Sequence, residues 1–273
     1  MAQYTNPDTR SKSQTREPSG LTLLRGRKPA TKTLGLNADG VLEVIQGYKK
    51  QSKFEYSHLD VPGIVALFEA VQYASKDPNA FIIRGALREH VDTRKKVYRR
   101  KDADRWGDTA HFEEYPRTAV MIDFDKVPLD NIDLVNDPEG TVRRAIQKFL
   151  PECYQDVSFV FQLSSSAGIG DDKGLLSVHI WFILDRPMGE AELKTFHKLK
   201  APAVDRSLFQ TNQVHYIADP IFEDGISDHI PQRIGLVELE ADKVSLPELP
   251  GSRGVCLSDH RQWTNRHRPR VRE

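Results

Sequence analysis

The chain has 273 residues, of which 38% are apolar and 29% charged, and its 39 Lys and Arg residues balance 39 Asp and Glu residues. This length can hold one large domain or two small ones with a hydrophobic core. A net charge of zero excludes a uniform field that attracts nucleic acid, so affinity for a polyanion must come from local patches.

Two widely separated cysteines, Cys153 and Cys256, argue against a zinc knuckle and against a disulfide framework, and they fit a reducing compartment. The sequence shows no signal peptide and no apolar run of membrane-spanning length. We therefore expect an intracellular, cytoplasmic protein that has no contact with a membrane.

The first third of the chain gives mixed signals. Residues 1–35 are rich in Ser, Thr, Lys, Arg and Pro, which predicts a flexible arm with a single apolar cluster at 21–24. Its basic residues offer contacts to phosphate, although a solvated tail is the simpler explanation. Residues 60–76 carry helical periodicity, and 80–83 predict a short buried strand. Residues 84–101 form the most basic internal run, which fits a solvated hairpin or a wall that faces phosphates.

From residue 118 the apolar pattern becomes regular. The order of elements is strand, helix, strand, strand, helix, strand, which matches the split βαβ, ferredoxin-like or RRM-like unit. The ranges are 118–124, 138–150, 157–163, 176–184, 189–200 and 213–217. We expect an α+β fold with a catalytic domain at 36–240, an RRM-like core at 118–218 and an additional N-terminal α/β subdomain. A further strand is predicted at 233–239, and a linker with a basic tail at 241–273.

Acidic residues end the first strand of this unit. Because successive side chains of a strand point to opposite faces, Asp123 and Asp125 share one face. Ser177 and His179 share a face at the start of the third strand. In the predicted topology the first strand lies between the third and the fourth, so Asp205, in the loop before the fourth, reaches the same sheet edge.

Three carboxylates at one edge indicate a site for a hard divalent cation. Oxygen ligands favour Mg²⁺ or Mn²⁺ over zinc. Two such ions can activate an attacking hydroxyl and stabilise a leaving pyrophosphate, which is the chemistry of phosphoryl transfer. Asp123, Asp125 and Asp205 are the candidate metal ligands, and a serine and a histidine beside them can donate hydrogen bonds to phosphate oxygens.

These residues resemble the three motifs of the archaeo-eukaryotic primase superfamily, in particular its primase-polymerases. Asp123-Phe-Asp125 is similar to the Asp-x-Asp motif, Ser177-Val-His179 to Ser-x-His, and Val204-Asp205 to the apolar-Asp motif. The resemblance covers about residues 80–240. It implies that the three aspartates hold the metals and that Ser177 and His179 hold the phosphates of the incoming nucleotide.

The resemblance further implies template-directed synthesis of primers on single-stranded DNA from nucleoside triphosphates, possible extension with deoxynucleotides, and a role in the DNA replication of a phage, plasmid or other mobile element. A replicative helicase is the implied partner, in trans or in a further C-terminal region, because no Gly-x-x-x-x-Gly-Lys-[Ser/Thr] loop is present. The chain departs from the family where His215-Tyr216 replaces a basic residue after the third motif. Candidates for that charge are Arg206, Arg233, Lys173 and Arg84.

Two other interpretations remain open. The stretch from Asp123 to Val127 also fits the start of haloacid-dehalogenase-type phosphatases, in which the first Asp is a nucleophile and 170–172 would serve as a late acidic motif. That family has a doubly wound parallel sheet, and it would leave Ser177 and His179 without a role. Alternatively, the chain is a non-catalytic replication initiator that binds DNA, as the basic run at 84–101 suggests.

Overall fold

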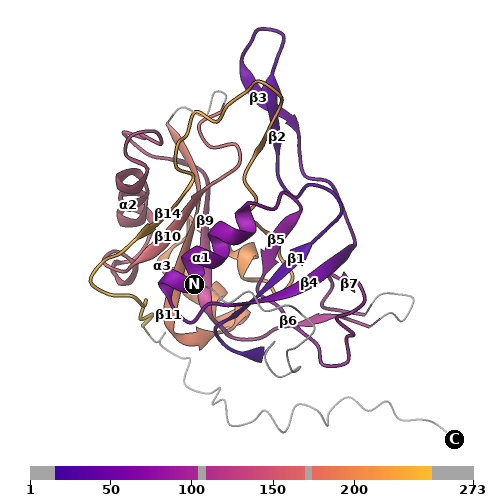
Figure 1. Ribbon diagram of the computed structural model, residues 1–273. Helices are drawn as coiled ribbons and strands as arrows, with labels where there is room; N and C mark the ends of the chain where they lie inside the picture. Colours follow the sequence, from indigo (N-terminus) through magenta and orange to yellow (C-terminus); the bar gives the residue numbers. More distant parts are fainter. Residues whose placement is uncertain (1–15, 104–108, 170–173, 248–273) are drawn as a thin grey trace, which may run out of the picture.

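The computed structural model describes residues 16–103, 109–169 and 174–247, and these form an α+β fold built on two main sheets (Figure 1). The first sheet has the order β14-β10-β11-β9, and every pair in it is antiparallel. Its strands are β9 (Arg117–Pro128), β10 (Phe159–Leu163), β11 (Leu175–Met188) and β14 (Ile234–Val237). The α+β prediction is confirmed.

Two helices follow the predicted pattern. Helix α2 (Pro138–Phe149) comes after β9, and α3 (Glu190–Lys200) comes after β11. The side chain of Asp137 caps α2 by accepting a hydrogen bond from the Gly140 amide at 2.9 Å, and Pro138 occupies the first turn, where its missing N–H is not needed. The predicted elements from 118 to 200 are thus confirmed, with β9 and β11 longer than expected.

The fourth strand of the predicted unit is a correction. The residues expected to form it, within 213–217, form the short strand β12 (His215–Tyr216), which pairs with β5 (Ala80–Ile83) in the second sheet. The place of a fourth strand is taken by β14, which pairs with β10 at the opposite edge. The order of the first three strands is as predicted, but no fourth strand lies beside β9 among the described residues.

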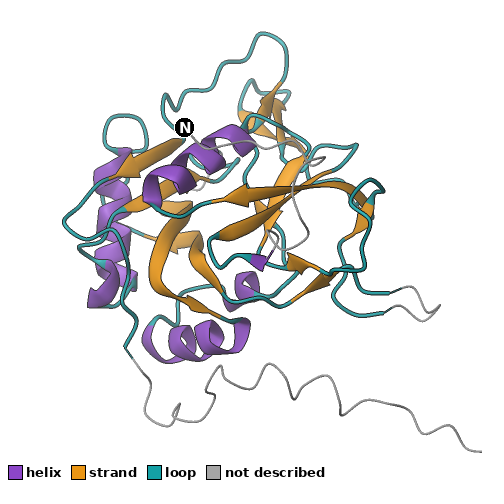
Figure 2. Ribbon diagram, turned by 60° about the horizontal axis from the view of Figure 1, so that its bottom comes forward, coloured by secondary structure: helices purple, strands orange, loops and turns teal. Residues whose placement is uncertain are grey.

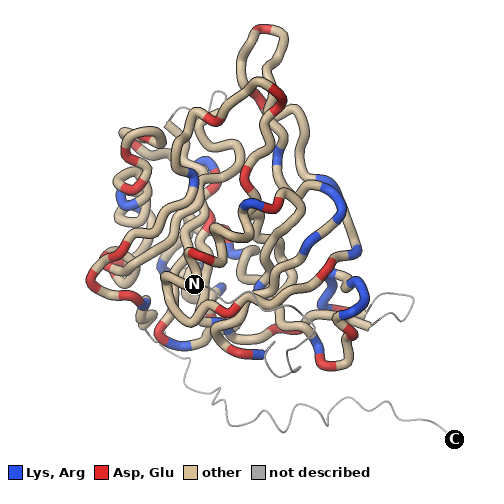
Figure 3. Tube along the Cα trace, in the orientation of Figure 1, with Lys and Arg blue, Asp and Glu red and all other residues tan. Residues whose placement is uncertain are grey.

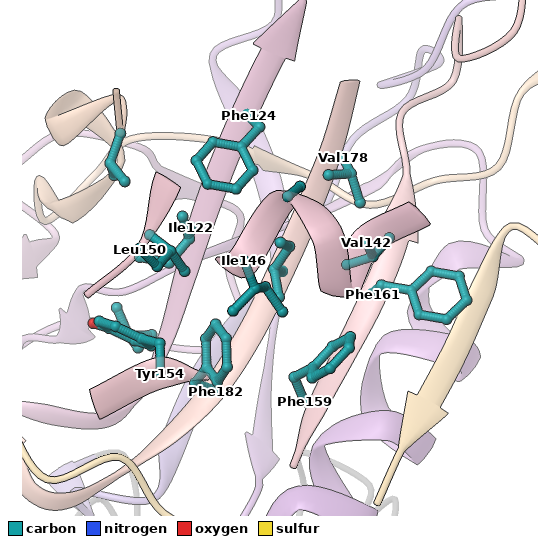
Figure 4. Close-up of a cluster of buried hydrophobic side chains, with 14 of the residues drawn as sticks. Ile122, Phe124, Val142, Ile146, Leu150, Tyr154, Phe159, Phe161, Val178 and Phe182 are labelled. Atoms are coloured by element: carbon teal, nitrogen blue, oxygen red, sulfur yellow. The ribbon is translucent and has the colours of Figure 1, made fainter. Parts of the chain in front are cut away.

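The outer face of the first sheet packs against α2 and α3. Aromatic and aliphatic side chains of β9, β10 and β11 meet Val142 and Ile146 of α2 in a continuous core (Figure 4). Phe182 lies at its centre, with its ring 4.8 Å from that of Tyr154 and 6.0 Å from that of Phe159. The 3₁₀ turn η3 (Glu152–Tyr154) carries this tyrosine into the core.

The second sheet has the order β12-β5-β1-β4-β7, with β1 (Gly20–Arg25) at its centre between β5 and β4 (Lys53–Asp60). Leu21 and Leu24 are fully buried in it. The prediction of a flexible arm over 1–35 is therefore wrong for residues 20–25, and residues 1–15 lie outside the described part. The apolar cluster was the stronger signal, because burying it in a sheet outweighs the polar composition around it.

Helix α1 (Ile64–Ser75) packs between the two sheets in one apolar cluster with Met121, Val160 and Trp181 (Figure 2). It begins after Gly63, later than predicted, because Asp60 still belongs to β4. Three shorter pairings complete the fold. The elements are β2 (Thr33–Leu36), β3 (Leu42–Gln46) and β13 (Ile221–Phe222) in one sheet, β6 (Ala86–Leu87) with β8 (Phe112–Glu113), and β7 (Val97–Tyr98) on β4.

The segment after β14 is a second correction. Residues 241–273 were predicted to be a linker and a tail, yet Val244 is fully buried and Leu246 is 7% exposed against the core of the first sheet. The amide of Val244 also donates a hydrogen bond to the carbonyl of Ile183 at 2.8 Å. The first part of the predicted linker thus belongs to the globular body, and residues from 248 on lie outside the described part.

Candidate active site between the two sheets

The polar residues of the sequence motifs lie on the inner face of the first sheet. On this face Met121 of β9 and Trp181 of β11 belong to the apolar cluster between the sheets. Strand alternation therefore puts Asp123, Asp125, Ser177 and His179 on that face too, just beyond the apolar contacts. We call these four residues the carboxylate floor.

The floor opens into a pocket of about 200 Å³ that both sheets line. The β10 strand and the loop after it contribute polar groups at Gln162, Ser164 and Ser165. Lys32 and Tyr48 come from the connections around β2 and β3, and Tyr216 comes from β12.

Across the floor, β9 and β11 pair so that each acid meets one donor. Asp123 and His179 are direct register partners, and the His179 Nε2 lies 3.4 Å from an Asp123 carboxylate oxygen. The Ser177 hydroxyl donates to Asp125 at 3.3 Å. These contacts bring together four of the five side chains that were expected at one sheet edge, and Asp205 is the fifth.

A β-bulge shapes the end of the floor. Two residues of β9, Asp125 and Lys126, lie opposite the single residue Ser177 of β11. Lys126 adopts a left-handed conformation with φ of 54°, which is uncommon outside glycine and asparagine. Its amide donates to the Ser177 hydroxyl at 3.0 Å, so the bulge fixes the serine that contacts Asp125.

Burial of Asp123 makes the negative charge of the carboxylate floor energetically costly. Burial raises the pKa of Asp123; the neighbouring His179 opposes that shift, while the charges of Asp125 and Asp205 raise the pKa further. A carboxylate that is desolvated beside two others favours a bound cation or a proton. The unpartnered Nδ1 of His179, buried with no hydrogen-bond partner among the described residues, leaves one polar atom for a ligand.

Asp205 lies near the floor without joining it. It is close enough to Asp123 for its charge to act on that carboxyl, but it does not line the pocket. Its carboxylate caps the 3₁₀ turn η4 (Arg206–Phe209), accepting from the Ser207 amide at 2.8 Å and the Ser207 hydroxyl at 2.9 Å. Among the described residues, no three acidic, histidine or cysteine side chains are grouped closely enough to hold one metal ion.

The donors nevertheless fit a single hard cation. Mg²⁺ is commonly held by one or two carboxylates plus substrate phosphates and water, and Asp123 with Asp125 supplies such a pair of oxygen ligands. Asp205 would complete a three-carboxylate set only by leaving its cap, which costs about 1 kcal/mol. The expected metals, Mg²⁺ or Mn²⁺, are therefore compatible with the floor, and a second ion would need Asp205 to turn.

Two predicted phosphate ligands, Arg84 and Arg233, do not line the pocket. Arg84 is 4% exposed and donates to the carbonyls of Ala119 at 2.5 Å and Met188 at 3.0 Å; burial, and then the charge of Arg117, lower its pKa to about 10. The prediction that Arg84 binds a phosphate is therefore corrected, because its guanidinium group is hydrogen-bonded to backbone carbonyls inside the fold.

Arg233 is also committed to the fold. It pairs with Asp228 and donates to the carbonyl of Ser164 at 3.0 Å, so it supports the pocket loop without lining the pocket. Lys173 lies outside the described residues.

The sequence analysis did not identify one lysine, Lys32, and two tyrosines, Tyr48 and Tyr216, that line the pocket. The Lys32 Nζ donates to the Ser166 hydroxyl at 2.7 Å and lies 5.9 Å from the ring centre of Tyr48. The rings of Tyr48 and Tyr216 stack with centroids 3.8 Å apart and an angle of 6° between their planes. The available signal was the replacement of a basic residue by His215-Tyr216 after the third motif, together with the basic content of the first 35 residues.

Comparison of the chain with protein-family models, with curated proteins and with solved structures finds no match. Among the described residues, no helix combines the length and the apolar character needed to cross a bilayer.

Proposed function

We propose that the protein is a nucleotidyltransferase of the primase-polymerase type, which joins nucleotides on a single-stranded DNA template using Mg²⁺ or Mn²⁺. The proposal includes an RRM-like core formed by β9, β11 and β10 with α2 and α3. It also includes a role in replication of a mobile element in the cytoplasm, with a helicase acting in trans or attached beyond this chain.

One observation carries the proposal. Asp123, Asp125, Ser177 and His179 come from two motifs that are 52 residues apart at their nearest members, and they meet across paired strands in one pocket that also contains a lysine. Two carboxylates on a rigid strand suit a divalent cation, while a serine, a histidine and a lysine suit the oxygens of a polyphosphate. Chance assembly of this set in a buried pocket is a poor alternative.

The reaction forms a bond from a primer 3′ oxygen to the α-phosphorus of a nucleoside triphosphate and breaks the bond to the β-phosphate, so pyrophosphate leaves. Asp123 and Asp125 would hold a divalent ion, which supplies charge stabilisation to the phosphates when bound. His179 offers its Nδ1 and Lys32 its ammonium group to the phosphate chain. Lys32 thus takes the role that sequence analysis sought among Arg206, Arg233, Lys173 and Arg84.

The phosphatase alternative loses support. The sheet that carries Asp123 is antiparallel in every pair, whereas that family has a doubly wound parallel sheet. The adjacent His179 and Ser177 also lack a role in that chemistry. A phosphoryl group trapped on Asp123 would revive it.

The test is incorporation of labelled nucleotides on a single-stranded template with Mg²⁺ or Mn²⁺. Asp123→Asn and Asp125→Asn keep the side-chain shape, and each is expected to lower incorporation at least about 100-fold. Asp130→Asn, at an exposed carboxylate, is the matched control and should leave the rate unchanged. His179→Ala is expected to raise the half-saturating nucleotide concentration while the metal dependence stays as it was.

Template-independent activity, or equal rates in the Asp123→Asn and Asp130→Asn proteins, would overturn the proposal. Binding of DNA with no incorporation under any of these conditions would favour the non-catalytic initiator instead.

A further inference from the structure

Two connections of the N-terminal region run side by side next to the pocket. Residues 26–32 link β1 to β2, and residues 47–53 comprise the link from β3 to β4 together with Lys53, the first residue of β4. The side chain of Gln51 ties them together: its oxygen accepts from the amides of Arg27 at 2.6 Å and Lys28 at 2.9 Å, and its nitrogen donates to the Lys28 carbonyl at 2.7 Å. The two segments therefore form one surface.

That surface, which we call the basic rim, holds six Lys or Arg residues and no Asp or Glu in its 14 residues. Most of its cations are exposed. They are Arg27, Lys28, Lys49, Lys50 and Lys53. In Figure 3 the tube between β1, β4 and the β2–β3 ribbon is blue on the right-hand side of the molecule. The five exposed positive charges, on segments that contain no acidic residue, create a local attraction for a polyanion that the neutral chain as a whole does not have.

The rim is continuous with the pocket. Lys32 and Tyr48 belong to these same two segments and line the pocket, whereas the five exposed cations do not. A nucleotide held within the pocket would therefore leave these five cations to another ligand. The stack of Tyr48 on Tyr216 stands where the rim meets the floor and offers an aromatic surface to an unpaired base.

The other basic segment, 84–101, is a weaker candidate because three of its cations are paired with acids. Arg88 lies 3.6 Å from Glu113, Arg94 lies 3.0 Å from Asp92, and Lys96 pairs with Glu55. The described residues include no such ion pair for the exposed cations of the rim. This contrast favours the basic rim over the segment at 84–101.

We propose that the basic rim binds the phosphate backbone of single-stranded nucleic acid and leads the strand into the pocket across Tyr48. The inference rests on the proposed function, for which it names the path of the strand. A single strand suits the site because its phosphates reach cations outside the pocket while its unstacked bases remain free to stack on tyrosine.

The experiment measures binding of the full chain to a fluorescein-labelled (dT)20 oligonucleotide by anisotropy over a range of salt concentrations. Lys49→Glu/Lys50→Glu is expected to weaken binding about tenfold or more near 100 mM salt. The milder Lys49→Ala/Lys50→Ala should reduce the slope of log affinity against log salt by about 1.4, since a phosphate contact on a single strand contributes about 0.7. Tyr48→Ala should weaken binding, and Tyr48→Phe should restore it.

Lys198→Glu/Lys200→Glu is the matched control, because it makes the same change of charge at exposed positions of α3, on the opposite side of the first sheet. Thermal unfolding of each variant checks the fold. Equal losses in the rim variant and the control, or no loss in either, would overturn the inference. Equal affinity of the unaltered chain for (dT)20 and for a dinucleotide would also overturn it, since the pocket alone would then explain binding.

The two proposals fail separately. If the chain incorporates nucleotides but Lys49→Glu/Lys50→Glu binds (dT)20 normally, the rim is wrong and the activity stands. If the rim variant loses binding but no protein incorporates nucleotides, the activity is wrong and the rim stands.

Discussion

The carboxylate floor and the basic rim border the same pocket but are built in opposite ways. The floor is set on two long, paired strands whose outer face is packed by α2 and α3, and Ser177 within it is only 8% exposed. The rim consists of connections whose charged side chains face solvent. Rigid placement suits groups that must hold a cation and phosphates at fixed distances, whereas exposed cations suit capture of a flexible chain.

The same contrast extends over the sequence. Described residues 16–103 hold 17 Lys and Arg against 10 Asp and Glu, whereas described residues from 109 on hold 12 against 21. The net charge of zero therefore hides a basic N-terminal region facing an acidic C-terminal one. A summed charge gives no information on such a division, and only the fold brings the two parts together at the pocket.

The largest expected effect tests the difference in packing between the carboxylate floor and the basic rim. Phe182→Ala removes a fully buried ring from the core on the helix-covered face of the first sheet and should lower the free energy of unfolding by about 4 kcal/mol. Tyr48→Ala, at a residue that is 39% exposed, should cost about 1 kcal/mol or less. Urea unfolding measures both. Similar losses in the two variants would mean that the wall of the pocket is as much a part of the core as the sheet below it.

A titration with pH should distinguish the buried core from the basic rim. The expected change in the free energy of unfolding is about half of that for Phe182→Ala. His197 is fully buried and His215 is 1% exposed, and burial lowers their pKa values to about 4 and about 3. In the unfolded chain these histidines have a pKa near 6.5, so the unfolded chain takes up protons before the folded chain does as the pH falls. Their contribution to stability is complete above pH 6.5 and is lost toward pH 4, by about 2 kcal/mol each at pH 5.

The measurement is the free energy of unfolding from pH 7.5 to pH 4.5, in the unaltered chain and in His197→Gln and His215→Gln. Each variant should show a shallower decline. The Lys and Arg charges of the rim do not change over this range, so binding of the oligonucleotide by the folded chain should not fall in parallel. An identical slope in all three proteins would contradict the buried, neutral histidines.

A small expected change in stability tests which region Asp205 belongs to. Asp205→Ala removes the cap of η4 and should cost about 1 kcal/mol, whereas Asp205→Ser keeps a capping oxygen and should cost little. If the carboxylate serves the floor during the reaction, both variants lose incorporation to the same extent. Full activity in Asp205→Ser would restrict this residue to capping.

The sequence allowed much of the floor to be predicted. The apolar period located β9, α2, β10, β11 and α3, and strand alternation alone placed Asp123 and Asp125 on one face. Pairing of β9 with β11 was also anticipated, and it brings His179 opposite Asp123. These are properties of long elements with strong local patterns, in which period and burial agree.

The fourth strand and the rim could not be found in this way. His215-Tyr216 is too short to carry a pattern, and its choice of β5 over β9 depends on which edge the rest of the chain leaves open. Lys32 and Tyr48 lie in polar connections with no period. Their meeting with the floor depends on contacts between distant segments, which composition does not encode.

The bulge at Lys126 has a consequence for how the strand tolerates change. Because it inserts one extra residue, Phe124 and Val127 both face the helices although they are three positions apart. The bulge thus changes the alternation of β9 at Lys126. Side chains after it no longer follow the period that places Asp123 and Asp125 on the pocket face. Lengthening β9 after Pro128 would leave both acids in place, and deleting Lys126 would remove the bulge while Val127 still faces the helices. A straight strand that kept Lys126 would instead turn Val127 toward the pocket and every later side chain to the wrong face.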